Sequence, residues 1–570
     1  MQSLKMNLSN EDILFFLKKK NITSFNLNGL YKYFGIKTKN ERKLLKKSIK
    51  ELIKNENIKK ENGIFFLLDK KEIKSVKNRI IGYKSPIKDF YIVCKTFKIK
   101  PSFPDEVLKE AEVIAFIPEN EIKNRKDYRN HIVFTIDGED AKDLDDAVGI
   151  YEDTDYTTLF VHIADVSFYV KEGSLLDKEA YKRGTSIYLA DRVVPMLPKI
   201  ISNGICSLNP NEDRLSMSVE ITFDKNFNIT NYKIEPGIIK SCRRFTYEEV
   251  EEIINNKKKD DLYNILKSME KLARGLREKR FKEGSIDFDI PETKIVCDNK
   301  SRPIKIKIQE RLFSHYIIEE FMLSANRVIA EIMQKNNTGL FRVHEDPDED
   351  KLNHFKKIAN SLGFDTKGLK KPKHFQEFIE KIKNTNYNYI LNTLLLRSMK
   401  QAYYHHENLG HFGLAFDIYT HFTSPIRRYP DLVVHRIIKD IISFESSKVR
   451  KNTLMLSKIG EYTSKMERIA AEAERAIVKR KAIHFLKDKL NKSFTGIVSG
   501  FIEKGIFVSL DDMGIEGMIP RTLLPSFKYE KNIGFKDGNK SLTLGTRVKV
   551  KLISLNLNKE TIDFTLEQIY

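Results

Sequence analysis

The stretch from Thr135 to Ala147 reads T-I-D-G-E-D-A-K-D-L-D-D-A, and six of its thirteen residues are acidic. The apolar residues Ile132, Val133 and Phe134 just before it predict a buried strand. The acids would therefore emerge where a strand gives way to a loop. Four of them have a spacing that suits metal chemistry: Asp137, Asp143, Asp145 and Asp146.

The spacing of these four acids favours a bent metal-binding loop. In an extended segment Asp143 and Asp145 point to one side and Asp146 to the other, so a bend would be needed to gather them around two ions. Hard divalent cations such as Mg²⁺ take carboxylate oxygens of this kind. A solvated acidic loop or a calcium site would have the same spacing, because short acidic motifs also match by chance.

Five further segments follow the acidic stretch. Together with it they resemble the ribonuclease II/ribonuclease R family, whose members are processive 3′→5′ exoribonucleases with an RNB catalytic domain. The resemblance runs from about residue 125 to the C-terminus, and the N-terminal segment described below places it nearest the ribonuclease R branch. The segments are R-G-T-S-I-Y-L-A-D-R-V-V-P-M-L-P (Arg183 to Pro198), L-N-P-N-E-D-R-L-S-M-S (Leu208 to Ser218), H-Y-I-I-E-E-F-M-L-S-A-N (His315 to Asn326), G-H-F-G-L-A (Gly410 to Ala415) and Y-T-H-F-T-S-P-I-R-R-Y-P-D-L (Tyr419 to Leu432).

The resemblance implies the metal chemistry of the site. It implies that Asp137, Asp143, Asp145 and Asp146 hold two Mg²⁺ ions, or Mn²⁺ in their place, with Asp145 indispensable for catalysis. Two metal ions can activate a water, stabilise the leaving oxyanion and neutralise phosphate charge.

The resemblance also implies the RNA contacts. Arg427 and Arg428 follow Ser424-Pro425, a helix-start pattern that would aim guanidinium groups at a phosphate. Arg427 would be the catalytic phosphate clamp. Three other side chains would contact RNA: Tyr188 by stacking near the 3′ end, Glu474 by holding the terminal sugar, and Glu319 as a weaker candidate. Solvated arginines, a structural tyrosine and a solvated glutamate are the ordinary alternatives.

The composition indicates which partners the protein binds and in which cellular compartment we expect it. The chain of 570 residues has a net charge of +21, and residues 1–100 hold 25 lysine and arginine residues against nine acidic ones, a net charge of +16. Such a basic head suits a polyanion such as nucleic acid, although a lysine-rich solvated surface would have the same composition. The four cysteines have no C-x-x-C spacing, and no apolar run reaches 18 residues. We therefore expect a cytoplasmic monomer that binds RNA, single-stranded at its 3′ end, and no membrane.

Residues 1–70 predict a small winged helix-turn-helix. A first helix carries Ile13, Leu14, Phe16 and Leu17, and a wing turns at Asn62-Gly63. The helix from about Lys39 would place Leu44, Leu45, Ile49, Leu52 and Ile53 on one face and Lys43, Lys46, Lys47 and Lys50 on the other. The basic face could dock on a phosphate backbone, and a solvated helix face explains it equally well.

The remaining chain predicts a multidomain α+β protein. Residues 71–124 form a basic linker and lead-in, with a strand over Phe90 to Phe97 and a helix over Pro104 to Ala115. Residues 125–490 form the mixed α/β RNB catalytic domain. Residues 491–570 form an OB-fold β-barrel of five strands, with Phe494, Phe501 and Phe507 as candidates for base stacking or core packing. About twenty residues separate Leu68 from Phe90, too few for the cold-shock barrels that the family normally carries there.

Two functions from different classes remain. The first is a hydrolytic exoribonuclease that releases nucleoside 5′-monophosphates. Without cold-shock barrels we expect a wider entrance to its active site, which would extend its substrates to structured RNA. The second is a non-catalytic nucleic-acid-binding regulator built around an inactive nuclease core. An inactive core should have lost acids, whereas all four are present. The sequence therefore favours the enzyme. We expect the adjacent His405 and His406 to be structural.

Overall fold

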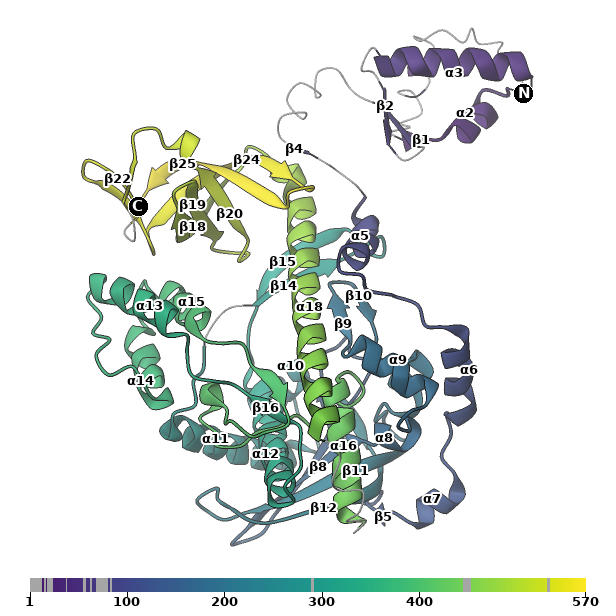
Figure 1. Ribbon diagram of the computed structural model, residues 1–570, viewed down its shortest axis with the longest axis vertical. Coiled ribbons are helices and arrows are strands. Elements are labelled where there is room, and N and C mark those ends of the chain that lie inside the picture. The colour runs from purple at the N-terminus through teal and green to yellow at the C-terminus, as the bar shows by residue number, and fades with distance from the viewer. Residues whose placement is uncertain are drawn as a thin grey trace.

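The computed structural model describes residues 13–14, 17, 24–36, 38–54, 58–61, 64–67, 80–81, 85–288, 292–443, 453–530 and 534–570. The chain forms a mixed α/β central domain with a C-terminal β-barrel above it and a small N-terminal module beyond them (Figure 1). Phe16 and the predicted wing turn at Asn62-Gly63 lie outside the described residues. Within the described ranges, no helix combines the length and the apolar character needed to cross a membrane.

The N-terminal module has a hydrophobic core of its own. Helix α2 (Leu27–Tyr33) and helix α3 (Lys39–Lys54) pack with an antiparallel sheet in the order β1-β3-β2, formed by β1 (Ser24–Phe25), β2 (Ile58–Glu61) and β3 (Ile64–Leu67). Leu44 was predicted to be buried, but it is 57% exposed, because it lies about 100° around the helix from its buried neighbour Leu45. The four lysines of α3 predicted to face outward are exposed: Lys43, Lys46, Lys47 and Lys50.

The lead-in to the central domain differs from its prediction. The segment Phe90 to Phe97 was predicted to be a strand, but it belongs to helix α5 (Asp89–Thr96). Phe90, Val93 and Cys94 are buried at helical spacing in a cluster with β9 (Ile187–Leu189), β10 (Arg192–Val194) and α18 (Thr453–Leu486). Helices α6 (Asp105–Ile114) and α7 (Glu119–Lys123) follow.

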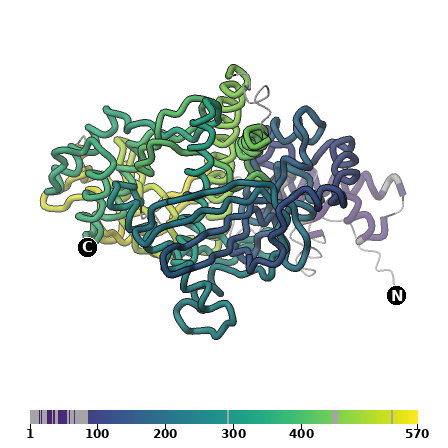
Figure 2. The backbone as a smooth tube through the Cα atoms, turned by 90° about the horizontal axis from the view of Figure 1, so that it is seen from below, coloured from purple at the N-terminus to yellow at the C-terminus, as the bar shows by residue number. Residues whose placement is uncertain are grey.

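A seven-stranded sheet in the order β13-β6-β7-β8-β11-β12-β5 forms the base of the central domain, and its strands lie side by side in Figure 2. The outermost pairs, β13 with β6 and β12 with β5, are parallel, and the inner pairs are antiparallel. The strands are β5 (Lys126–Asp127), β6 (Phe134–Asp137), β7 (Asp146–Glu152), β8 (Thr157–Ala164), β11 (Asp213–Phe223), β12 (Ile229–Lys240) and β13 (Arg243–Thr246).

Helices cover this sheet and form the main core with it (Figure 1). The sheet's central strands are almost continuously buried, as expected when packing covers a strand on both faces. The helices of this core are α8 (Val166–Tyr169), α9 (Leu175–Arg183), α10 (Tyr247–Ile254), α11 (Tyr263–Glu283), α12 (Phe313–Lys335) and α16 (Tyr429–Ile442). Helices α13 (Glu349–Ser361), α14 (Pro372–Ile382) and α15 (Asn388–Ser398) pack together in a separate core. The hairpin of β14 (Glu292–Cys297) with β15 (Pro303–Gln309) and the two-stranded antiparallel sheet of β16 (Phe341–Val343) with β17 (Tyr403–His405) complete the domain.

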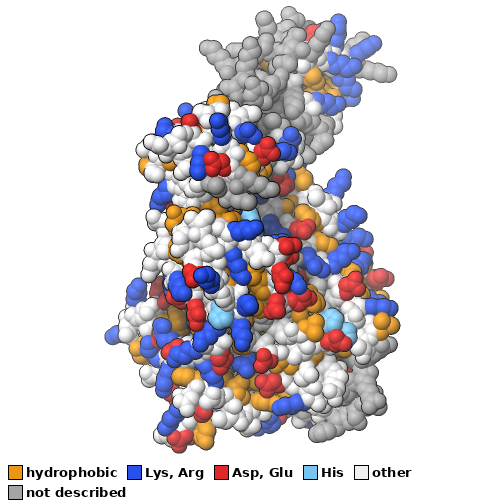
Figure 3. Space-filling view, turned by 60° about the vertical axis from the view of Figure 1, so that its left-hand side comes forward, with side chains coloured by type: hydrophobic (Ala, Val, Ile, Leu, Met, Phe, Trp, Pro, Cys, Tyr) orange, Lys and Arg blue, Asp and Glu red, His pale blue; other side chains and the backbone are white. Residues whose placement is uncertain are grey.

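The long helix α18 leads into the C-terminal barrel, which forms a lobe of its own in Figure 3. The five predicted strands are confirmed, and pairing of β18 with β24 closes them into a barrel. A sixth strand, β4 (Ile80–Ile81), joins parallel to β24. The barrel strands are β18 (Ser493–Ile502), β19 (Gly505–Leu510), β20 (Glu516–Pro520), β24 (Arg547–Asn556) and β25 (Thr561–Ile569). A small sheet of β21 (Lys528–Glu530), β22 (Gly534–Asp537) and β23 (Lys540–Thr543) lies between β20 and β24 in sequence.

Candidate active site

The acidic stretch lies at one end of two neighbouring strands, as its sequence predicts. Strand β6 ends at Asp137, and the chain returns to the sheet as β7 at Asp146. Hydrogen bonds hold the connecting loop in place. The Arg244 guanidinium donates to the carbonyls of Gly138 (3.0 Å) and Glu139 (2.8 Å). These bonds fix the bend that brings the acids together.

Ser207 fixes the second half of this loop from the other side. Its hydroxyl donates to the Lys142 carbonyl at 3.1 Å and accepts a hydrogen bond from the Leu144 N–H at 3.1 Å. Leu208 N–H also donates to the Leu144 carbonyl at 3.0 Å. The start of the L-N-P-N-E-D-R-L-S-M-S segment therefore positions Asp143 and Asp145.

The electrostatics of the cluster disfavour several negative charges in one place. Burial, together with the charge of Asp143, raises the pKa of Asp137 to about 7 and the pKa of Asp145 to about 8. Burial and the charges of Asp137 and Asp145 hold the pKa of Asp146 well above its usual value. Asp137 Oδ2 is buried without a hydrogen-bond partner within the part of the chain that the structure describes. Such a group of carboxylates suits a cation.

The Ser424-Pro425-Ile426-Arg427 turn faces this cluster. Asp145 Oδ1 accepts the Ile426 N–H at 2.9 Å, and Asp145 Oδ2 lies 3.4 Å from Arg427 Nε. The Arg427 guanidinium also donates to Ser424 Oγ at 2.8 Å, and its side chain remains 40% exposed. The predicted helix start at Ser424-Pro425 is wrong by several residues, because α16 begins at Tyr429. The turn, rather than a helix N-terminus, aims Arg427.

Tyr188 connects the acidic cluster to helix α18. Its hydroxyl donates to Asp143 Oδ2 at 3.3 Å, and its backbone N–H donates to Glu474 Oε1 at 3.0 Å. Burial raises the pKa of Glu474. The Tyr188 side chain is 40% exposed, which leaves part of its ring open to a ligand. Residues far apart in sequence therefore surround the aspartates.

The strand that carries Tyr188 is fixed to the arginine turn. Ser186 N–H donates to the Arg427 carbonyl at 2.9 Å, and Thr185 Oγ1 donates to the same carbonyl at 3.0 Å. Tyr429 N–H donates to the Gly184 carbonyl at 3.0 Å. The R-G-T-S-I-Y and S-P-I-R-R-Y segments thus form one unit around the site.

Arg428 and Glu319 are placed differently from the other predicted residues. Arg428 is largely buried and donates to Asp431 Oδ1 at 2.7 Å, a carboxylate oxygen that also accepts the Ser424 N–H. Glu319 lies on α12 and pairs with Arg280 at 3.3 Å and with Arg311. Both side chains have structural partners, and their contact with RNA stays a prediction.

Comparison with known proteins gives the family. Residues 125–443 match the RNB domain, and residues 487–567 match the S1 RNA-binding domain. Ribonuclease R of Aquifex aeolicus is 40% identical to this chain over 491 residues, 83% of the chain and 70% of that protein. The chain belongs to the ribonuclease R family of 3′→5′ exoribonucleases.

Other members and a solved structure agree with this assignment. Ribonuclease R 1 of Lactococcus lactis is 41% identical over 84% of this chain and 60% of that protein. The chain therefore spans 60% to 70% of the length of these two relatives. The structure of Mycoplasma genitalium RNase R with ribose-methylated single-stranded RNA matches with a TM-score of 0.80 at 30% identity. The match covers 85% of this chain and 78% of the Mycoplasma chain. Its complex with double-stranded RNA has a TM-score of 0.76 at 29% identity, over 85% of this chain and 84% of that one.

Three residues of this ribonuclease R-type site had not been predicted. Arg244 and Ser207 fix the acidic loop. The third residue is Tyr247 at the start of α10. Burial, together with the nearby charges of Asp146 and Asp137, raises the pKa of the Tyr247 hydroxyl. Ser207 directly precedes the L-N-P-N-E-D-R-L-S-M-S segment, which is a usable signal. Arg244 follows the acids by about a hundred residues with no motif around it, and only the parallel pairing of β13 with β6 brings it there.

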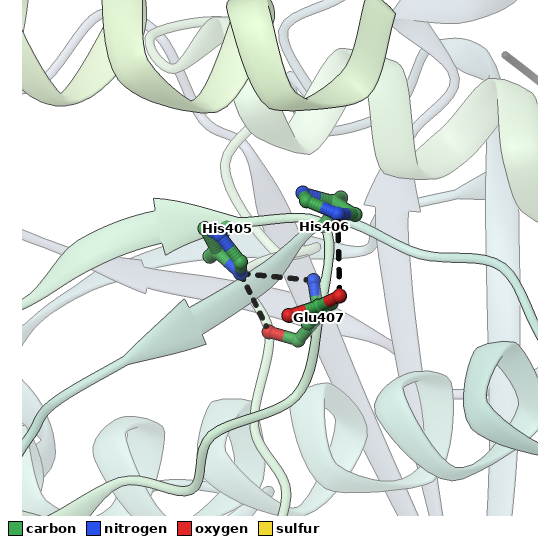
Figure 4. A group of neighbouring side chains, drawn as sticks. All are labelled: His405, His406 and Glu407. Carbon is green, nitrogen blue, oxygen red and sulfur yellow. Dashed lines mark hydrogen bonds and ion pairs between the residues drawn. The ribbon is translucent and has the colours of Figure 1, made fainter. Parts of the chain in front are cut away.

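A second group of possible metal ligands lies at the end of β17, formed by His405, His406 and Glu407 (Figure 4). The chain turns after His405, so the two imidazole rings face each other with centroids 4.4 Å apart. His405 Nδ1 accepts the Glu407 N–H at 3.1 Å, and His406 Nε2 lies 3.6 Å from Glu407 Oε1. These contacts stay within the group, so the predicted structural role of the two histidines remains a prediction.

Proposed function

We propose that this chain hydrolyses RNA processively from the 3′ end and releases nucleoside 5′-monophosphates. The observation that carries this proposal is the meeting of three motifs distant in sequence. Asp145 contacts the Ile426–Arg427 turn, and Asp143 contacts Tyr188. A cluster of acids with a partly exposed arginine and a partly exposed aromatic ring suits phosphodiester cleavage at the end of a single strand.

We further propose that Asp137, Asp143, Asp145 and Asp146 hold two Mg²⁺ ions, which Mn²⁺ can replace. The donor set supports this, because all four side chains offer carboxylate oxygens and Asp137 Oδ2 has no partner among the described residues. Burial and mutual repulsion make the ionised cluster costly without cations. When bound, such ions supply Lewis-acid stabilisation and an activated water for in-line displacement.

The protein's own side chains would bind and orient the RNA end. Arg427 would bond to the scissile phosphate, since its guanidinium is 40% exposed beside Asp145. Tyr188 would stack on a base near the 3′ end. Glu474 holds the Tyr188 backbone with one oxygen, and its other oxygen would accept the 2′-OH of the terminal sugar. These contacts would favour RNA over DNA.

We propose that the N-terminal module is a winged helix that contacts phosphates, and that the entrance admits structured RNA. The order of α2, α3 and the β2–β3 hairpin supports the first, as do the exposed lysines of α3. About twenty residues lie between β3 and α5, too few for a further barrel at this point. Fewer barrels around the entrance would leave more room for a duplex.

The competing function is a non-catalytic nucleic-acid-binding regulator, and one assay separates the two. Single-stranded RNA labelled at its 5′ end is incubated with the protein in Mg²⁺ or in EDTA, and the products are resolved by length. The processive exonuclease predicts conversion of full-length RNA to a short 5′-labelled end product in Mg²⁺ and intact RNA in EDTA. Bound but intact RNA in both reactions would favour the regulator.

A further inference from the structure

The hairpin of β14 and β15 has one apolar face and one basic face. Ile295 lies directly opposite Ile306, and Lys294 lies directly opposite Lys307. Since side chains alternate between the two faces of a strand, the isoleucines share one face, and Lys305 shares the other face with Lys294 and Lys307. Ile306 is buried in the core of the C-terminal barrel, and Ile295 packs against that core. All three lysines are exposed.

This hairpin connects the barrel to the strand pair that carries Tyr188. At one end, Thr293 Oγ1 donates to the Met513 carbonyl of the barrel at 3.2 Å. At its turn, Ser301 Oγ donates to Asp191 Oδ2 at 2.5 Å, and Asp191 lies in the turn between β9 and β10. In Figure 1 the hairpin accordingly lies beside α18, below the barrel and above β9 and β10.

Contacts with α18 hold the turn of the hairpin in place. The buried Lys481 of α18 donates to the Ser301 carbonyl at 2.6 Å and lies 3.5 Å from Asp191 Oδ1. Ala482 and Ile483 of the same helix share the barrel core with Ile306. The basic face is therefore held at a fixed place between the barrel and the active site.

The three lysines have no counter-charge among the side chains that the structure describes. No ion pair joins Lys294, Lys305 or Lys307 to an acidic side chain in the described part of the chain, whereas the neighbouring Arg302 pairs with Asp298 at 2.7 Å. Like charges directly opposite on an antiparallel pair destabilise it. Lys294 and Lys307 are such a pair. A face that accumulates uncompensated positive charge suits a polyanionic ligand.

We propose that this lysine face binds backbone phosphates of single-stranded RNA on its way from the barrel to Tyr188. The proposal rests on the proposed function and specifies where the incoming strand runs. Lysines act as point charges on phosphates, so the contact carries no sequence preference. Figure 3 shows lysine and arginine side chains following one another down the face below the barrel, in keeping with a strand that crosses from one body to the other.

The test compares two triple variants with equal loss of charge. The first carries Lys294→Gln, Lys305→Gln and Lys307→Gln. The matched control carries the same substitution at Lys109, Lys123 and Lys126, which are exposed on α6, α7 and β5. Binding of a fluorescent single-stranded RNA is measured in EDTA at several salt concentrations, which keeps the RNA intact. Degradation in Mg²⁺ is measured in parallel.

Counterion release sets the expected result. Each phosphate contact on a single strand contributes about −0.7 to the slope of log K against log salt, so losing three contacts should make the slope shallower by about 2. Binding at 0.1 M salt should weaken by up to about 100-fold, and the difference should shrink as salt rises. A third variant with arginine at the three hairpin positions should bind as the wild type does, because it keeps the charges.

Each outcome separates this inference from the proposed function. If wild type degrades RNA but the hairpin variant binds like the control variant, the lysine face is not part of the RNA path, while the nuclease assignment stands. If wild type neither binds nor degrades RNA, both are overturned. Thermal unfolding checks the fold, and the glutamine variant should melt no earlier than wild type, since its substitution removes the repulsion between Lys294 and Lys307.

Discussion

Replacing Asp145 with asparagine tests the active site most directly. The substitution keeps the shape of the side chain, and the remaining Oδ1 can still accept the Ile426 N–H that it now accepts at 2.9 Å. It removes the negative charge beside Arg427 Nε, 3.4 Å from Asp145 Oδ2, and one charged ligand from the proposed metal site. The variant therefore changes the electrostatics of the site far more than its packing.

The size of the effect follows from the charge that is lost. Metal-centred stabilisation of the transition state is worth several kcal/mol. A loss of about 4 kcal/mol lowers a rate by roughly 10³-fold. RNA binding should survive, since Tyr188, Arg427 and the barrel are unchanged. The variant should also fold normally without metal, because burial already disfavours the ionised form of Asp145.

The assay uses single-turnover degradation of end-labelled RNA in Mg²⁺, with RNA binding and thermal unfolding measured on the same preparations. Asp140→Asn is the matched control, because Asp140 lies in the same acidic loop, carries the same charge and is exposed. We expect the control to degrade RNA at close to the wild-type rate. A near-normal rate for Asp145→Asn, or equal losses in both variants, would refute the assignment of the metal site.

Three further predictions concern product length, the N-terminal module and pH. Tyr188→Ala should lengthen the smallest degradation product, because stacking is worth about 1–3 kcal/mol per base. Tyr188→Phe keeps the aromatic ring and should give the wild-type product lengths. Unchanged product lengths in both variants would exclude stacking. Wild-type protein should degrade through a duplex with a short 3′ overhang, and stalling at the duplex junction would count against the open entrance. A variant beginning at Ile80, which retains β4 and the buried Asp89, should bind RNA more weakly and with less salt dependence. Unchanged binding by this variant would count against phosphate contacts of the N-terminal module. Burial lowers the pKa of His162 to about 3 and of His435 to about 4, so the unfolded chain takes up protons below about pH 6.5 that the folded chain does not, and each histidine should lower stability by about 2 kcal/mol between pH 6.5 and pH 5. The raised pKa values of Asp137 and Asp145 act in the opposite direction, so the contribution of a histidine is measured as the difference in urea unfolding between wild type and His435→Gln; a difference that stays constant over this range would contradict it.

The sequence predicted correctly those secondary-structure elements that have a clear hydrophobic pattern or a clear turn signal. The buried strand before Asp137 and the five strands of the barrel follow from apolar runs separated by glycines, and each is present. The segment Phe90 to Phe97 shows the limit of this reasoning. A short apolar run fits a buried strand and a buried helix alike, and packing against β9, β10 and α18 selects the helix.

The residue types of the site could be predicted from the sequence, because those that a phosphodiesterase needs occur in compact motifs: the four aspartates, the arginine turn and Tyr188. Which residues meet was decided only by the tertiary structure. Arg427 reaches Asp145 whereas Arg428 turns to the buried Asp431, and Arg244 reaches the acidic loop through a parallel strand pairing. The physical reason is that side-chain chemistry is fixed by residue type, while a contact between residues a hundred or more positions apart depends on how sheets pair and which buried charges must be satisfied.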